Sequence, residues 1–477
     1  MYKLFINGEN VDSPSGESYE IRNPATSEVV DTVAKGNAEA AKSAIDAAED
    51  ALERWSEVAP VQAPPLLSRA AQLIRSNEQE LATLLTKEQG KTLPESLGEI
   101  RFFAKTLEYY SGAKITGSYL TLTDKVSAEV VKEPIGVVGG IVPWNNPVML
   151  MGAKVVSAIK SGDTIVIKPA SSTPLSTIRC AQILSEAGLP KGVFNVVAGP
   201  GGVVGEELLR NPKVRKVSFT GESETGKHIM EVAARDLKRV TLELGGSNPV
   251  IVADDADLEA AVDNTLFGRF RNCGQGCMCI KRAYVFEKVA DQFIKRLVEK
   301  VKSIRVGNGL VQGVTMGPIH SASQREGFEE QVGDGIGKGA KVITGGKRPA
   351  GTEYDKGFFY LPTLLEDADP SSKVVREEVF GPALPIFRVK DMDEAVVMGN
   401  DSIYGLGAHL WTRDIQKAMK AARRLKAGTI LVNTPYGAGG WEIEVPMGGF
   451  KHSGLGREYG IEGMGHYQET KTIVYGT

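Results

Sequence analysis

The sequence has little with which to form disulfide bonds or to cross a membrane. Its 477 residues include only four cysteines, and three of these lie within a span of seven residues. That set is a poor disulfide framework for a long chain, so we expect a reducing, cytoplasmic setting. No apolar run approaches the ~18 residues of a membrane span. The segment Met1–Gly8 lacks the pattern of a signal peptide.

The sequence also lacks a large excess of positive or negative charge. The net charge is -3, so neither a nucleic-acid nor an anionic membrane partner is expected. Apolar residues make up 42% and charged residues 24%, as in ordinary globular proteins. No repeat or low-complexity linker divides the chain. At roughly 150 residues per domain, the length predicts two or three domains.

The first third of the chain reads as short strands followed by helices. Residues 1 to about 35 have the pattern of short strands and turns. Helical patterns then run through residues 64 to 112. Before them, an amphipathic helix is indicated by apolar residues at helical spacing: Ala41, Ile45, Ala48, Leu52 and Trp55.

From residue 130 onward, short β-branched runs alternate with helical segments. The expected strands are 137–142, 164–168, 194–197 and 214–219, and the expected helices lie near 147–160, 174–187, 202–210 and 223–235. This alternation predicts a parallel sheet covered by helices on both faces. Such sheets bind ligands at the carboxyl ends of their strands.

A second α/β region is expected from about 248 to 435, after a strand at 240–244 that ends in two glycines. It includes strands at 283–286 and 429–432. Two further segments, 119–131 and 469–475, alternate like strands. They could form an arm that pairs with another subunit, or a hairpin within one chain, and the residues alone leave both open.

Cys277 is the first candidate for chemistry. It lies in the glycine-rich segment 270–279, where side-chain bulk is kept away from the backbone. A reactive thiolate needs an accessible, electropositive setting. Three other interpretations compete: an inert buried thiol, a CxxxCxC metal cluster, for which no second Cys or His group lies nearby, and a disulfide between Cys273 and Cys277.

Two polar residues follow predicted strands. Glu243 stands at an apolar strand end before Gly245-Gly246, where burial would raise its pKa toward that of a general base. A Glu held by backbone amides at a turn is the alternative. Asn145, in the segment 143–147, carries an amide that can donate to a developing oxyanion, although Asn is also common in turns.

Two weaker signals suggest a nucleotide. Residues 219–226 join a strand to a helix with a GxxxxG spacing, which resembles a dinucleotide-binding turn. Lys168 directly follows another strand and could reach a ribose or a phosphate, although an isolated lysine is more often solvated.

Together these segments resemble the aldehyde dehydrogenase superfamily, over nearly the whole chain. The motifs occur in order: Asn23-Pro24-Ala25-Thr26, Pro143-Trp144-Asn145, Ile167-Lys168-Pro169-Ala170, Phe219-Thr220-Gly221, Leu242-Glu243-Leu244-Gly245-Gly246, Gly274-Gln275-Gly276-Cys277, Glu378-Val379-Phe380-Gly381-Pro382 and Gly448-Gly449-Phe450-Lys451. Each is short, but eight in register are very improbable by chance.

The resemblance implies an α/β fold with three parts. A Rossmann-like parallel-sheet cofactor domain would comprise residues 1–118 and 139–246, and a second α/β catalytic domain residues 247–440. A small β oligomerisation arm would comprise residues 119–138 and 457–477. The family assembles as dimers or tetramers, so a homodimer or homotetramer is expected, with no nucleic-acid or membrane partner.

The resemblance also implies catalytic roles. Cys277 matches the nucleophile, Glu243 the base that activates water, and Asn145 the oxyanion donor. Lys154 and Glu469 match a pair thought to relay protons from the base. The presence of Glu243 favours hydrolysis of the thioester over transfer of the acyl group to coenzyme A, and no metal is implied.

A bound NAD or NADP is implied as well. Lys168 and Glu378 match residues on the ribose hydroxyls, Phe380 the aromatic beside the nicotinamide, and Gly221 and Gly226 the pyrophosphate turn. Ser171 stands where NAD-preferring relatives often have Glu, which favours NADP slightly. The other expected cofactor contacts are Val142, Pro143, Trp144, Gly201, Thr220, Glu222 and Leu244.

The aldehyde pocket is the least certain part of the resemblance. Many members have Lys where Ser247 stands, and the residue after the oxyanion Asn is often Phe rather than Asn146. Cys273 and Cys279 add further thiols. An amide at Asn146 and a small residue at Ala153 favour a short hydroxyaldehyde, such as glyceraldehyde or lactaldehyde. The expected substrate contacts are Asn146, Leu150, Ala153, Gly276, Met278 and Trp441.

Two other classes of function remain open. A thiol esterase or acyltransferase on the same fold would need Cys277 and Glu243 but no hydride transfer. A non-enzymatic binding or structural protein is the second, and the intact set of Asn145, Glu243 and Cys277 argues against it.

Overall fold

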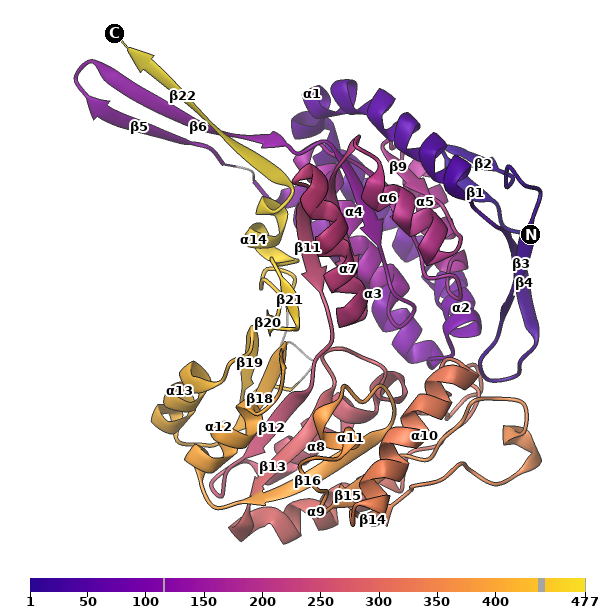
Figure 1. Ribbon diagram of the computed structural model, residues 1–477, viewed down its shortest axis with the longest axis vertical. Coiled ribbons are helices and arrows are strands. Elements are labelled where there is room, and N and C mark those ends of the chain that lie inside the picture. The colour runs from indigo at the N-terminus through magenta and orange to yellow at the C-terminus, as the bar shows by residue number, and fades with distance from the viewer. Residues whose placement is uncertain (115, 436–441, 477) are drawn as a thin grey trace.

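The computed structural model describes residues 1–114, 116–435 and 442–476. Two α/β units lie one above the other, and a β arm projects from the upper one (Figure 1). The units are built on an eight-stranded and a seven-stranded sheet, and the arm is a three-stranded sheet. Within the described part of the chain, no helix has the length and apolar character needed to cross a membrane.

The sheet of the first unit has the order β2-β1-β9-β8-β7-β10-β11-β21. Its five central strands are parallel, whereas β1, β2 and β21 add antiparallel edges. Every residue of β8 is buried, as expected for a strand covered on both faces. The bounds are β1 (Leu4–Ile6), β2 (Glu9–Val11), β7 (Val137–Ile141), β8 (Thr164–Lys168), β9 (Phe194–Val196), β10 (Val214–Thr220), β11 (Arg239–Glu243) and β21 (Gly454–Leu455).

The strands and helices expected between residues 137 and 244 are all present, with ends that shift by one or two residues. The helices are α4 (Pro147–Ser161), α5 (Leu175–Glu186), α6 (Glu206–Arg210) and α7 (Ser223–Ala233). The helix expected near 202–210 begins as a π-helical turn, η1 (Gly201–Gly205), before it continues as α6. The alternating pattern therefore predicted this sheet and the helices that cover it correctly.

The N-terminal helical region is more continuous than its sequence suggests. A single helix, α1 (Ala38–Ser76), runs through Pro60, Pro64 and Pro65, and α2 (Glu78–Gln89) and α3 (Leu93–Gly112) follow. Proline in a helix interior removes a backbone hydrogen bond and usually breaks the helix. Here the apolar face of α1 is buried on both sides of the prolines, from Trp55 to Ile74. Tertiary packing therefore overrides the local signal.

The second unit has the order β14-β15-β16-β13-β12-β18-β19, parallel except for β14. Its strands are β12 (Asn248–Val252), β13 (Ile280–Phe286), β14 (Lys341–Thr344), β15 (Thr363–Glu366), β16 (Ala383–Val389), β18 (Gly407–Trp411) and β19 (Thr429–Val432). The covering helices are α8 (Leu258–Phe270), α9 (Glu287–Val301), α10 (Ala322–Gly337), α11 (Lys373–Arg376), α12 (Met392–Asn400) and α13 (Ile415–Arg424). Two short pairs, β3 (Ser18–Arg22) with β4 (Val29–Ala34) and β17 (Tyr404–Gly405) with β20 (Phe450–Lys451), complete the strands of the two units.

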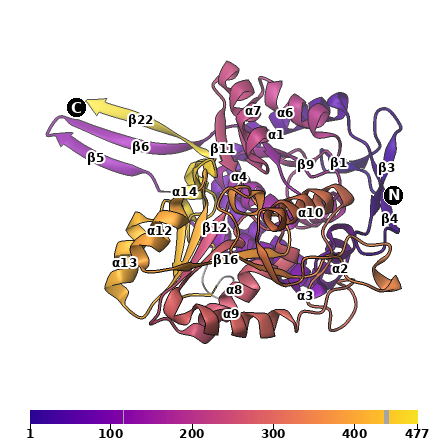
Figure 2. The same cartoon turned by 60° about the horizontal axis from the view of Figure 1, so that its bottom comes forward.

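The two alternating segments join in one arm. β5 (Ser118–Thr123), β6 (Val126–Pro134) and β22 (Gln468–Gly476) form an antiparallel sheet that extends away from the body in both views (Figures 1 and 2). These strands occupy less than the expected ranges 119–138 and 457–477. The other residues of those two ranges lie outside the arm, because β7 joins the large sheet and α14 (Gly460–Gly465) packs against α4.

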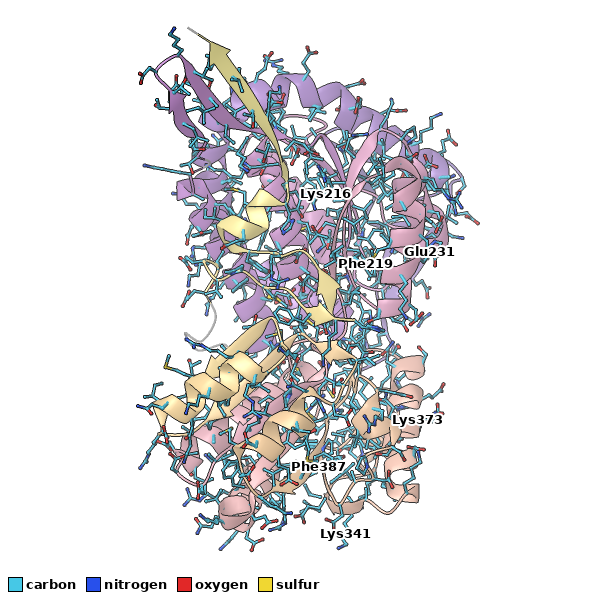
Figure 3. The ribbon with its side chains drawn as sticks, turned by 60° about the vertical axis from the view of Figure 1, so that its left-hand side comes forward. Lys216, Phe219, Glu231, Lys341, Lys373 and Phe387 are labelled. Carbon is cyan, nitrogen blue, oxygen red and sulfur yellow. The ribbon has the colours of Figure 1, made fainter. Side chains whose placement is uncertain are left out.

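Strand β10 links the interior of the first unit to its ligand-binding edge. Figure 3 shows Lys216 and Phe219 along this strand, with Phe387 in the other unit. Both Lys216 and Phe219 are buried, and the strand ends at Thr220, where the functional site begins.

Candidate functional site

A cavity of about 460 Å³ opens where the carboxyl ends of β7, β10 and β11 face the second unit. It is lined by ten residues expected from the sequence: Pro143, Trp144, Asn145, Thr220, Gly221, Glu222, Leu244, Cys277, Glu378 and Phe380. Sequence reasoning missed others, including Gln324, Gln331, Tyr404 and His452. These come from remote segments without a local motif, so only the tertiary fold reveals them.

Cys277 follows a loop segment whose backbone is strained at two residues. The backbone of Asn272 and Cys273 is left-handed, with φ of 47° and 56°, which is uncommon outside glycine. At Gly274 a Cβ would meet the Arg269 guanidinium at 2.2 Å, so this position requires glycine. All four cysteines, which the structure describes, are free. The disulfide interpretation is therefore wrong for this structure.

The electrostatics of Cys277 do not by themselves favour a thiolate. The pKa of its thiol is raised to about 12, chiefly by burial and in smaller part by Glu378 and Glu243, whereas Lys281 and Arg271 lower it. Cys277 is nevertheless partly exposed to the cavity. The thiol is thus reachable but protonated, and its reaction needs a proton acceptor or added positive charge.

A buried arginine holds the Cys277 loop. Arg269 is fully buried, and its guanidinium donates to the carbonyls of Ile280 (2.9 Å) and Gly274 (2.8 Å) on either side of Cys277. It also donates to the carbonyl of Gly381, beside Phe380. One side chain therefore connects the loop of Cys277 to the loop of Glu378 and Phe380. No sequence signal distinguished it from a surface arginine.

Glu243 ends β11 and is almost completely buried, with 1% of its surface exposed. Neither carboxylate oxygen has a hydrogen-bond partner. Burial raises the pKa of this carboxyl well above its usual range, and the nearby Glu458 adds to the shift, while Lys154 and Arg457 oppose it. The structure thus excludes a Glu satisfied by backbone amides and leaves a carboxyl with two unpartnered oxygens, which can exchange a proton with a neighbouring group.

The partner expected for Lys154 is wrong. Its ammonium forms an ion pair with Glu458, which is 2% exposed, and donates to the Thr220 hydroxyl at 2.7 Å. Glu469 instead lies at the base of the arm and binds Arg239 on the surface at 2.9 Å. Glu469 lies in β22, which extends along the arm. Glu458 lies in the segment before α14, which returns to β11. The resemblance implied only Glu469, and Glu458 emerges from the fold.

Asn145 lies just beyond β7, and only 4% of its surface is exposed. Its Nδ2 donates to the Gln275 carbonyl at 3.2 Å, a long bond within the segment that precedes Cys277. The amide thus points to the nucleophile loop across the junction of the two units. A turn residue alone would not need such a contact.

The turn from β10 to α7 suits a phosphate group. A Cβ at Gly221 would lie 2.4 Å from the Phe219 ring, and one at Gly226 would lie 2.7 Å from Leu244. Helix α7 begins without a side-chain cap from Glu222, so its first amides stay available to an anion. The two glycines therefore bring the helix end and the strand end close together.

Other expected cofactor residues lie beyond the cavity, along the same edge of the sheet. Lys168 ends β8 and is 6% exposed, its Nζ donates to the Pro169 carbonyl at 2.9 Å, and burial lowers its pKa to about 8. Ser171 is exposed and donates to the Gly199 carbonyl at 3.0 Å. Gly201 is exposed in the π-helical turn η1. Val142 is buried and donates its N–H to the Lys168 carbonyl.

The far wall of the cavity carries a charged and aromatic cluster. Glu378 accepts a hydrogen bond from the Gly246 N–H at 2.9 Å and pairs with the buried Lys281. The Lys281 ammonium lies 4.8 Å from the centre of the Phe380 ring. On the other side, Trp144 contacts Phe380 edge-on and stacks on His320, with ring centres 4.4 Å apart.

The expected substrate contacts are mostly not at the cavity surface. Ala153 and Met278 pack into the hydrophobic core, and Leu150 is 2% exposed. The side-chain oxygen of Asn146, Oδ1, accepts a hydrogen bond from Lys91 Nζ at 2.8 Å, so this amide oxygen faces protein. A Cβ at Gly276 would approach the Cys279 sulfur at 2.9 Å. Trp441 lies outside the described residues.

Lys281 gives a first prediction about this site. Lys281→Met removes a positive charge near Cys277 and leaves Glu378 unneutralised, and both changes raise the pKa of the thiol. We expect the pH profile of Cys277 alkylation by iodoacetamide to move up by about 1 pH unit or more. Lys281→Arg, which keeps the charge, is the control. An unchanged profile in Lys281→Met would show that this ammonium has no influence on the thiol.

Comparison with known proteins assigns the family. Residues 11–473 match the Aldehyde dehydrogenase family. The betaine aldehyde dehydrogenase of Bacillus subtilis (strain 168) is 41% identical, covering 99% of this chain and 97% of that protein. The succinate-semialdehyde dehydrogenase (NADP(+)) GabD of Escherichia coli (strain K12) is also 41% identical, with 99% and 98% covered. A crystal structure of an E. coli NADP dependent enzyme has a TM-score of 0.96 and 40% identity, covering 100% of this chain and 98% of that one.

The chain therefore belongs to the aldehyde dehydrogenase family, as its motifs predicted. The α/β fold with its two units is likewise that of solved relatives. In the described ranges, no group of three or more His, Cys, Asp or Glu side chains could hold a metal ion.

Proposed function

We propose that this protein oxidises an aldehyde to a carboxylic acid with NAD(P)+, through a thioester on Cys277. The observation that carries the proposal is the carboxylate of Glu243. It is buried with both oxygens unpartnered, near the only one of the four thiols that is partly exposed. A panel of aldehydes assayed with NAD+ and with NADP+ tests the proposal, because absorbance at 340 nm must rise.

The residues divide the chemistry into addition and hydrolysis. The Cys277 thiol loses its proton to solvent, its sulfur adds to the carbonyl carbon as the C=O π bond opens, and Asn145 Nδ2 exchanges its long bond to Gln275 for one to the new oxyanion. NAD(P)+, which the turn at Gly221 together with Glu378 and Phe380 would hold, would supply a hydride acceptor, and loss of a hydride from the carbon bound to Cys277 would leave an acyl group on the sulfur. Glu243 then takes a proton from water as that water attacks the thioester.

The ion pair of Lys154 and Glu458 lies next to Glu243. It can receive the proton that Glu243 takes from water. Glu458 is close enough to raise the pKa of Glu243, and its second oxygen has no partner. Ser218 donates to the first oxygen at 3.3 Å. A buried acid with spare acceptor capacity next to the base is suited to proton transfer.

The residues present fit a dinucleotide. The cradle of Gly221 and Gly226 at the start of α7 suits the pyrophosphate, Lys168 the adenosine ribose, and Glu378 the second ribose. Phe380 and Trp144 supply apolar surface for a flat ring. The relatives include one named for NADP and a crystal structure of an NADP dependent enzyme.

Cofactor preference gives a second prediction. Position 171 carries an exposed serine and no carboxylate that would repel a 2′-phosphate, and Lys168 lies near it. We expect kcat/KM for NADP+ to be at least equal to that for NAD+. Ser171→Glu should shift the preference toward NAD+, and Ser171→Gln, which adds bulk without charge, is the control. A parent preference for NAD+ of about tenfold, some 1.4 kcal/mol, would contradict this expectation.

The substrate is proposed to be a small polar or hydroxy aldehyde, such as glyceraldehyde or lactaldehyde. The relatives are named for small polar aldehydes, and neither Asn146 nor Ala153 brings an aromatic wall to the start of α4. Because Lys91 already occupies the Asn146 side-chain oxygen, that amide can offer a substrate hydroxyl only its Nδ2.

The third prediction ranks these substrates. We expect kcat/KM for glyceraldehyde to exceed that for hexanal, because an alkyl chain leaves buried polar groups unpaired at about 1–3 kcal/mol each. Propanal, which matches glyceraldehyde in length, separates polarity from size. If hexanal is the better substrate, the pocket is apolar and this proposal fails.

A thiol esterase or acyltransferase would use Cys277 and Glu243 without a cofactor. Hydrolysis of an activated ester with no change at 340 nm for any aldehyde would favour it.

The arm is proposed to pair with a second subunit in a dimer or tetramer, because its surface exposes apolar side chains that include Tyr119 and Val474. Four free thiols suit a reducing cytoplasm.

A further inference from the structure

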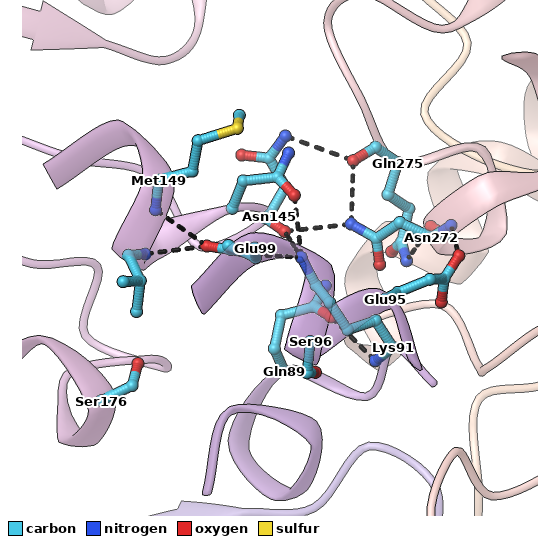
Figure 4. A network of polar contacts seen from close by, with 12 residues as sticks. Gln89, Lys91, Glu95, Ser96, Glu99, Asn145, Met149, Ser176, Asn272 and Gln275 are labelled. Atoms are coloured by element: carbon cyan, nitrogen blue, oxygen red, sulfur yellow. Dashed lines mark hydrogen bonds and ion pairs between the residues drawn. The ribbon is translucent and has the colours of Figure 1, made fainter. Parts of the chain in front are cut away.

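The first turns of α3 carry two carboxylates that face the catalytic loops. Glu95 and Glu99 are four residues apart and so share one face of the helix. Glu99 Oε1 accepts hydrogen bonds from the backbone N–H groups of Val148 (2.9 Å) and Met149 (3.1 Å), at the start of α4 (Figure 4). A carboxylate is favoured at the N-terminus of a helix, so Glu99 fixes the helix that directly follows Asn145.

Lys91 connects Glu99 to Asn145. Its side chain is 2% exposed, and its ammonium makes three contacts, as many as it has hydrogens. They are Glu99 Oε2 at 2.5 Å, the Asn145 carbonyl at 2.8 Å and Asn146 Oδ1 at 2.8 Å. The backbone on which the Asn145 amide is mounted is thus held by a buried charge.

The same carbonyl is tied to the nucleophile loop. Asn272 Nδ2 donates to the Asn145 carbonyl at 3.0 Å, and the Asn272 N–H donates to Glu95 Oε1 at 2.6 Å. The other oxygen of Glu95 is held by Thr92, through its N–H at 2.9 Å and its hydroxyl at 2.8 Å. Helix α3 of the first unit therefore fixes Asn145 on one side and the loop of Cys277 on the other (Figure 4).

We infer that Lys91, anchored by Glu99, is a positioning residue that sets the oxyanion donor Asn145 against Cys277. This inference rests on the proposed function, in which Asn145 stabilises the tetrahedral oxyanion. Such a donor is effective only where it is preorganised, and a displacement of about 1 Å can reduce the rate roughly 10²-fold. Lys91 itself touches neither the substrate nor the reacting atoms.

A second buried carboxylate in the same region serves as a matched control. Glu88 is fully buried and accepts from the backbone N–H groups of Leu175 (2.8 Å) and Ser176 (2.9 Å), at the start of α5. It thus caps a helix as Glu99 does, but it contacts neither Lys91 nor the loop of Cys277 through any described hydrogen bond. Glu88→Gln should weaken the fold without displacing Asn145.

The test compares pre-steady-state bursts of NAD(P)H in the full-length enzyme. Lys91→Met combined with Glu99→Gln removes both buried charges together, so that neither is left unpaired. We expect the burst rate to fall about 10- to 100-fold. NAD(P)+ binding, followed by fluorescence, and alkylation of Cys277 by iodoacetamide should each stay within about twofold, since neither involves an oxyanion.

A double-mutant cycle separates positioning from general damage. If Lys91 acts through Asn145, the pair of substitutions should add little to the loss that Asn145→Ala already causes. Glu88→Gln, assayed well below its Tm, should keep the parent burst rate. Additive losses, or an equal loss in Glu88→Gln, would overturn the inference.

Two further outcomes are decisive. If the charge-free variant does not fold, Glu99→Gln alone is combined with Asn145→Ala in the same cycle. We then expect a smaller loss of burst rate that is again non-additive. An additive loss would count against the inference. A parent enzyme that forms no NAD(P)H with any aldehyde, although Cys277 is alkylated, would overturn the proposed function and this inference with it. A parent burst with additive losses overturns the inference alone.

Discussion

Cys277→Ala is expected to abolish aldehyde oxidation. In the proposed mechanism the sulfur forms the covalent bond that carries the acyl group, and no other described thiol lines the cavity. The measurement is the formation of NAD(P)H at 340 nm with saturating aldehyde, and the expected rate is that of the uncatalysed background.

Cys279→Ala is the matched control, because Cys279 is buried two residues away and does not line the cavity. Cys273→Ala should likewise be tolerated. If Cys277→Ala keeps more than a few per cent of the parent rate, or if Cys279→Ala is equally inactive, the assignment of the nucleophile is wrong.

Glu243→Gln should separate the two halves of the reaction. Acylation of Cys277 needs no water and should still give a burst of NAD(P)H, whereas the steady rate should fall about 10²–10⁴-fold without the general base. The substitution also replaces a buried, unpartnered carboxyl by a neutral amide. We therefore expect Tm to stay level or to rise.

The burst amplitude decides between two roles for Glu243. Loss of the burst with an unchanged Tm would mean that this carboxylate takes the proton of Cys277, whose pKa burial raises to about 12. Glu458→Gln provides a comparison, because it removes the second acid but leaves Glu243 in place. A steady rate equal to that of the parent in Glu243→Gln would exclude Glu243 as the base.

The sequence predicted well those features that depend on local pattern. Strands from β7 to β11 follow from short apolar runs between helical segments, and the Gly-rich turns mark where they end. Cys277, Glu243 and Asn145 were predicted as site residues because each lies in a short motif at the end of a strand or in a glycine-rich loop. Such signals are contained within about ten residues.

Features that depend on distant contacts were missed or misassigned. Lys154 lies 304 residues from Glu458, and the family resemblance implied Glu469 instead. Arg269 and Lys91 resemble surface cations in the sequence, yet both are buried against backbone carbonyls. The side chain of Asn146 was expected to face substrate, but its side-chain oxygen faces Lys91 because α3 packs beside α4. Which way a polar side chain turns is decided by packing, and no local signal encodes it.

The return of the chain to the first unit has a consequence for the order in which the enzyme is made. Strand β21 pairs with β11 beside Glu243, and Glu458 reaches Lys154 only from this late segment. Domains generally fold from the N-terminus as they leave the ribosome. The first sheet can therefore assemble early, yet the edge that carries Glu243 stays incomplete until the segment from Gly454 to Glu458 has been synthesised. A nascent chain that has not yet reached β21 therefore has the β10–α7 turn and the loop of Cys277, but Glu243 lacks the neighbouring carboxylate of Glu458.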